Sequence, residues 1–184
     1  MTFDVKTAAL TDLFSTYGAI LRELKGRGIV RTENAPAGDY AEYLVAKAIG
    51  GKLEGNSKRS FDLRAPDGRR IQVKCRVADV SKKNPRTQLS VFRSFDFDQV
   101  AIVLLTADYA VHRGVLVPSA FAKQKASFRK HVNGYVLHAR TSLLDAVGNV
   151  DITAALRAAS EGRSEVDSVT IATLGRSRSF RKSP

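Results

Sequence analysis

The stretch SFDLRAPDGRRIQVKCR, residues 60–76, predicts a β-hairpin. Apolar and polar side chains alternate on both sides of a short turn, over residues 61–64 and again over residues 71–76. This period of two is typical of half-buried strands. The polar positions carry Asp62, Gln72 and Lys74, a set of side chains that a purely structural hairpin does not require.

The composition of the turn predicts how the two strands pair. Residues 66–68, with proline first and glycine last, suit a three-residue loop made of a type I turn and a left-handed glycine. In that register Asp62 lies opposite Gln72 and shares one face with Gln72 and Lys74. A two-residue loop would instead place Asp62 across from Ile71 and scatter the polar side chains.

Helix and strand patterns around the hairpin predict an α/β (α+β) fold. Apolar residues spaced by three and four predict a helix over residues 6–25. A second helix is expected within residues 34–51, with Asn34 or Asp39 as the capping residue. The other expected elements are strands at 52–54, 97–105, 111–117, 133–139 and 169–173, a helix from Ser119 to about Lys130, and short helices within 142–147 and 151–159.

Length and composition predict one globular domain over residues 1–160, followed by a flexible basic tail over residues 161–184. The chain has 184 residues, of which 43% are hydrophobic and 26% charged. The single cysteine, Cys75, excludes an intramolecular disulfide and suits a reducing compartment, so we expect a cytoplasmic protein. The longest apolar run, residues 100–105, is far too short to span a membrane.

The charge balance favours a polyanionic partner. The chain carries 30 Lys and Arg against 18 Asp and Glu, which gives a formal net charge of +12. Residues 109–144 contain no carboxylate. We therefore expect DNA as the partner, although a basic surface that only aids solubility remains an alternative. The candidate phosphate contacts are Lys58, Arg59, Arg76, Lys82, Lys83 and Arg86.

The polar face of the hairpin suits a hydrolytic phosphodiester site. Asp62 and Gln72 offer side-chain oxygens to Mg²⁺ or Mn²⁺, and the Val73 carbonyl lies beside them. Lys74 could orient or deprotonate the attacking water and offset developing negative charge. Glu42 lies at the edge of the apolar face of the second helix, where burial of a carboxylate is costly unless it is used or paired.

The arrangement of Glu42 on a helix, Asp62 on a strand and Gln72-Val73-Lys74 on the next strand resembles the PD-(D/E)XK nuclease superfamily. The glutamine resembles its Mrr-like branch, and the stretch also looks like uncharacterised bacterial proteins assigned to the superfamily. The resemblance covers about residues 36–118. It implies a restriction-endonuclease-like fold, a central mixed sheet of αβββαβ type flanked by helices, with a divalent metal and hydrolysis of DNA.

Other interpretations stay open at this stage. Gln72 removes a negative charge from the metal site, so a disabled nuclease fold that only binds nucleic acid is the main alternative. Glu42 could pair with Lys47 or Lys74, and Asp62 with Lys74, as ordinary ion pairs. An HNH-type nuclease would require metal-binding histidines, but His112, His131 and His138 are scattered along the chain. No membrane partner is expected, and a homodimer is possible.

Overall fold

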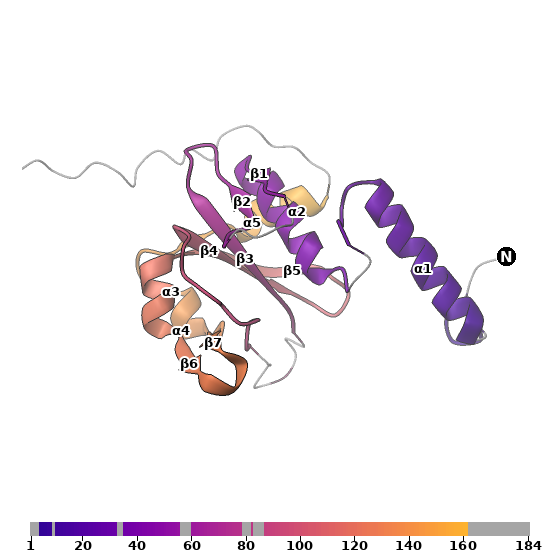
Figure 1. Ribbon diagram of the computed structural model, residues 1–184. Coiled ribbons are helices and arrows are strands. Elements are labelled where there is room, and N and C mark those ends of the chain that lie inside the picture. Colours follow the sequence, from indigo (N-terminus) through magenta and orange to yellow (C-terminus); the bar gives the residue numbers. More distant parts are fainter. Residues whose placement is uncertain are drawn as a thin grey trace, which may run out of the picture.

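A six-stranded mixed sheet lies at the centre of the molecule and confirms the α/β fold class (Figure 1). The computed structural model describes residues 4–8, 10–32, 35–55, 60–78, 82 and 87–161. The strand order is β1-β2-β3-β4-β5-β8, and only β3 and β4 run parallel within it. These strands are β1 Lys52–Leu53, β2 Leu63–Arg64, β3 Arg70–Val77, β4 Gln99–Leu105, β5 Val111–Pro118 and β8 Val150–Asp151.

Helices and a second hairpin cover the two faces of the sheet. Helices α2 (Ala37–Ile49) and α5 (Thr153–Ser160) pack on one face. The other face carries α3 (Ser119–Lys125) and α4 (Thr141–Leu144). Beside them lies a hairpin of β6 (Ser127–Arg129) and β7 (Gly134–Val136), joined by the 3₁₀ turn η1 (Lys130–Val132). Helix α1 (Leu10–Gly26) stands apart from the sheet in Figure 1.

Side chains along β3 alternate between the buried core and the opposite face of the sheet. Ile71 and Val73 are buried in the core under α2, as the period-two pattern predicts. Gln72 and Lys74 therefore point to the opposite face, where they are half-buried. Strand β4 is buried on both faces, which is the expected environment of a strand that pairs in parallel with its neighbour.

The predicted register of the hairpin is confirmed. The Ala65 N–H donates to the Arg69 carbonyl at 2.9 Å, and the Gly68 N–H donates to the Ala65 carbonyl at 2.9 Å. Gly68 has a φ of 88°, a left-handed conformation that glycine adopts without a steric penalty. The same register pairs Leu63 with Ile71, so the preceding residue lies opposite Gln72.

Two predicted helices are wrong in part, because short strands take their place. Helix α3 ends at Lys125, and Ala126 is extended with ψ of 151°, which starts β6. Pairing of β6 with β7 outweighs the helical pattern of this lysine-rich segment. At the other position, β8 pairs with the edge of β5 before α5 begins at Thr153.

The predicted caps also need correction. Asp39 does not cap α2; its carboxylate accepts the backbone N–H groups of Arg31 and Thr32, each at 2.7 Å, and so holds the loop that precedes the helix. The N-cap position is Pro36, which has no side-chain cap. Asn34 lies outside the described residues.

The connection between β3 and β4 departs from the αβββαβ order that the resemblance implies. None of the residues described between them, 78, 82 and 87–98, is helical. The chain instead crosses in an irregular segment that pairs with β7 through Phe92 and Tyr135. The proposed tail after residue 161 and the strand at 169–173 lie outside the described residues. No helix in the described ranges is long and apolar enough to cross a membrane.

Candidate active site

The hairpin brings three of the predicted site residues into contact. The Gln72 amide nitrogen donates to Asp62 Oδ2, and the Val73 backbone N–H donates to the same oxygen at 2.6 Å. The Gln72 amide also lies 3.3 Å from the Val73 carbonyl oxygen. Burial raises the pKa of Asp62, while the Val73 N–H and the positive charge of Lys74 act in the opposite direction. The acid is therefore held on the strand that carries Gln72.

Lys74 projects from the same face of β3 and is held by the irregular segment. Its Nζ donates to the Val91 carbonyl at 3.2 Å and lies 4.9 Å from the centre of the Phe92 ring. Burial lowers the pKa of Lys74, whereas the charges of Asp62 and Glu42 oppose that shift. Lys74 is thus within electrostatic range of both carboxylates, while its Nζ donates to the backbone of the irregular segment.

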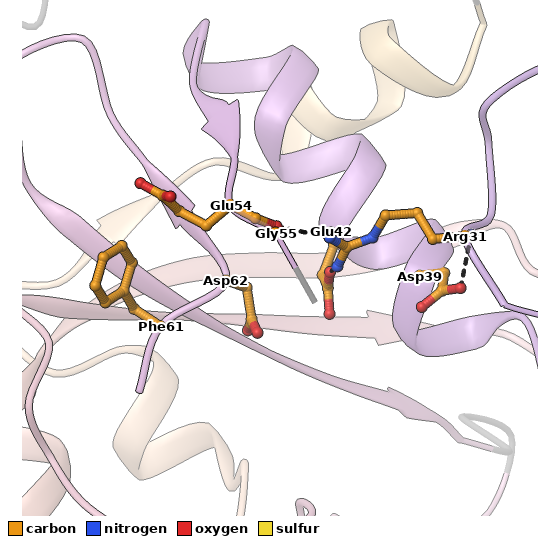
Figure 2. A pocket seen from close by; sticks show the side chains of 7 residues that line it. All are labelled: Arg31, Asp39, Glu42, Glu54, Gly55, Phe61 and Asp62. Carbon is orange, nitrogen blue, oxygen red and sulfur yellow. Dashed lines mark hydrogen bonds and ion pairs between the residues drawn. The ribbon is translucent and has the colours of Figure 1, made fainter. Parts of the chain in front are cut away.

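Glu42 reaches the same region from α2, and its side chain is only 15% exposed. It forms an ion pair with Arg31, rather than with either lysine considered from the sequence. Burial raises the pKa of Glu42 to about 7, and the Asp62 charge adds to this effect, although Arg31 opposes it. Figure 2 shows both carboxylates, of Glu42 and Asp62, pointing toward the same side of the pocket.

A polar pocket of about 210 Å³ opens at this position (Figure 2). Its lining comprises Arg31, Asp39, Glu42, Glu54, Gly55, Phe61 and Asp62. The Arg31 guanidinium spans it, because it donates to the Glu54 carbonyl at 2.9 Å as well as pairing with Glu42. Arg31 lies in a loop, so no periodic pattern predicted its position. The expected burial of Glu42 indicated only that this carboxylate would be used or paired.

The donor atoms near Asp62 fit a hard divalent cation. They are a carboxylate, a backbone carbonyl and a side-chain amide, and Mg²⁺ and Mn²⁺ prefer such oxygen ligands. A half-turn of the Gln72 amide exchanges its oxygen and nitrogen at almost the same positions, which would bring the oxygen beside Asp62. Burial raises the pKa of Glu42 and of Asp62, so a cation bound between them would favour the charged form of both carboxylates.

No metal cluster of the kind that an HNH-type nuclease needs is present within the described ranges. No three side chains of His, Cys, Asp or Glu gather there as metal ligands. The candidate magnesium site differs from such a cluster because half of its donors are an amide and a backbone carbonyl.

Cys75 packs against the core on the α2 side, and burial raises the pKa of its thiol to about 12.

The predicted phosphate contacts are only partly placed. Arg76 follows Lys74 by two residues on the same face of β3, and its Nε is buried with no hydrogen-bond partner among the described residues. Lys82 is exposed. The other candidates, Lys58, Arg59, Lys83 and Arg86, lie outside the described residues.

Comparisons with known proteins add no family at this point. Neither the protein-family models nor the curated proteins gave a match to this sequence. The chemistry of the pocket therefore has to carry the functional inference.

Proposed function

We propose that the protein is a metal-dependent nuclease that hydrolyses phosphodiester bonds of DNA. The observation that carries the proposal is the convergence of Asp62, Gln72 and Lys74 on one sheet face beside the carboxylate of Glu42. The resemblance of this arrangement to the PD-(D/E)XK superfamily supports the same activity.

Each residue has a defined part in the proposed reaction. Asp62, Gln72 and the Val73 carbonyl would hold Mg²⁺ or Mn²⁺, with Glu42 as a further oxygen ligand or as a base toward water. When bound, the cation supplies Lewis-acid stabilisation of the charge that develops on the phosphate. Lys74 Nζ would orient the attacking water, accept its proton in the neutral state, or offset negative charge as an ammonium.

Two properties of the chain support DNA as the substrate. The formal net charge of +12 attracts a polyanion at long range. Arg76 lies next to Lys74 on the same strand face and has a buried Nε without a partner in the described residues, so it could meet the phosphate that follows the scissile one.

A second candidate function is a disabled nuclease fold that binds DNA without cleaving it. One specific observation favours it: the polar groups of the site already satisfy one another. Gln72 donates to Asp62, and Arg31 forms an ion pair with Glu42, so a cation would have to displace existing hydrogen bonds. Hydrolysis in the presence of metal is what separates the two candidates.

The direct test is incubation of purified protein with supercoiled plasmid, branched DNA and single-stranded DNA in Mg²⁺, Mn²⁺ or EDTA. We expect cleavage with metal and none in EDTA. The Asp62→Ala variant should lose cleavage, because it lacks the only carboxylate that the hairpin supplies on this face. Cleavage by Asp62→Ala at the wild-type rate would remove Asp62 from the site, and binding without cleavage in every metal would favour the second candidate.

A further inference from the structure

A basic groove is lined by residues of α3, α4 and the β6–β7 hairpin. Figure 1 shows these elements together on one side of the molecule. The volume of the groove is about 330 Å³. The polar side chains that line it are Lys125, Ser127, Arg129, His138, Arg140 and Ser142. The pairing of Ser127 with Val136, and of Arg129 with Gly134, places Ser127 and Arg129 on one face of the hairpin. That face forms one wall of the groove.

The cations of the basic groove have no acidic partner in the part of the chain that the structure describes. Residues 109–144 contain no carboxylate, so neighbours in sequence provide none. The nearest acid along the chain, Asp145, pairs instead with Arg113. The side chains of Arg129 and Arg140 are exposed and form no ion pair with a carboxylate of the described residues. Cations that converge on a hollow without compensation are what an anionic ligand requires.

The basic groove is physically connected to the candidate active site. Gln88 pairs with His138 of the groove, and Phe92 pairs with Tyr135, each through an isolated β-bridge. At the Phe92 end, the ring and the neighbouring Val91 carbonyl hold Lys74. Residues 88–92 therefore link the lining of the groove to the groups that hold Lys74.

We infer that the basic groove binds a backbone phosphate of the same DNA, away from the phosphate that is cleaved. This inference rests on the proposed function for its reference point, the scissile phosphate at Lys74. Arg129 and Arg140 supply forked donors to the phosphate oxygens, while Ser127 and Ser142 supply hydroxyl groups at the rim. The contact is to the backbone, so it adds affinity and register without reading sequence.

The test measures binding of a fluorescent DNA duplex over a range of salt, in EDTA so that no cleavage occurs. The double variant Arg129→Gln/Arg140→Gln should bind about 10- to 100-fold more weakly near 0.1 M salt, with a slope of log K against log salt that is shallower by about 1. The charge-keeping variant Arg129→Lys/Arg140→Lys is the matched control and should stay within a few-fold of wild type. Both variants should unfold at the wild-type temperature, because these side chains are exposed.

An unchanged affinity and slope in the glutamine variant would overturn the groove as a DNA site. Another outcome is that inorganic phosphate at millimolar concentration weakens DNA binding by wild type only, while the glutamine variant binds DNA as wild type does. That result would assign the groove to free phosphate and would also overturn the inference. Failure of the proposed nuclease activity gives a different result. A wild type that binds DNA through the groove but does not cleave it with any metal supports this inference and contradicts the activity.

Discussion

The carboxylate of Asp62 accepts the backbone N–H of Val73 at 2.6 Å, across the hairpin and eleven residues along the chain. This contact attaches the acid to the strand that carries Gln72 and Lys74. The turn at Gly68 joins the two strands of the hairpin. A site built on paired strands keeps its geometry better than one built on loops.

Divalent cations should stabilise the folded protein, because the donor oxygens meet only in the native state. At 10 to 100 times the dissociation constant, Mn²⁺ or Mg²⁺ should raise the free energy of unfolding by about 1.4 to 2.7 kcal/mol. The Asp62→Asn variant should lose this rise, as measured by thermal unfolding with and without EDTA. Asp67→Asn, which alters an exposed carboxylate in the turn of the same hairpin, is the control and should keep it. If the metal still raises the free energy of unfolding of Asp62→Asn, the cation binds at another position.

Gln72 separates the working nuclease from the disabled one. Gln72→Glu adds a second anionic oxygen at the same reach, so cleavage should persist at a lower Mg²⁺ concentration than in wild type. Gln72→Leu removes the ligand oxygen and should reduce the rate by about 100-fold or more. A titration of Mg²⁺ against cleavage rate checks both variants. Activity that appears only in Gln72→Glu, with an inert wild type, would support the binding module instead.

Stability should depend on pH through Glu42, whose pKa in the folded protein is raised to about 7. The folded state binds this proton more tightly than the unfolded state does. The contribution is therefore fully present below the unfolded pKa of 4.5 and is lost as pH rises through about 7. Between pH 5 and 8, in EDTA, wild type should lose about 2 kcal/mol more unfolding free energy than Glu42→Gln, at about 1.4 kcal/mol for each pKa unit.

Urea unfolding at several pH values measures this difference. The Asp residues with lowered pKa, such as Asp39, titrate at more acidic pH and do not enter this window. If the free energy of unfolding depends on pH equally in wild type and Glu42→Gln, Arg31 neutralises Glu42 fully. That result would contradict the raised pKa of Glu42.

Local chemistry explains why the hairpin could be predicted from the sequence. Proline and glycine at the two ends of the turn act within three residues, and the period-two pattern assigns each strand its buried face. The register then follows, and with it the meeting of Asp62 and Gln72. The partial burial of Glu42 followed from helix periodicity in the same way.

The remaining parts of the site depend on contacts that no local pattern encodes. Arg31 enters from a loop, held by Asp39, and Val91 reaches Lys74 from an irregular segment 17 residues away. Strand β6 was missed because its short sequence continues the composition of helix α3; only its pairing with β7 makes it extended. Such segments take their conformation from tertiary contacts rather than from their own propensities.

The most direct test is the single-turnover rate of DNA cleavage by wild type and Lys74→Ala, measured beside DNA affinity in EDTA. The proposed site predicts that Lys74→Ala cleaves at least about 100-fold more slowly, because the attacking water loses the group that positions it. Its affinity for DNA should change by only a few-fold, since one cation among 30 Lys and Arg is lost. Lys47→Ala, an exposed cation at the end of α2, should cleave as wild type does. Cleavage by Lys74→Ala at the wild-type rate, or a wild type inert on duplex, branched and single-stranded DNA with both Mg²⁺ and Mn²⁺, would contradict the proposed nuclease site.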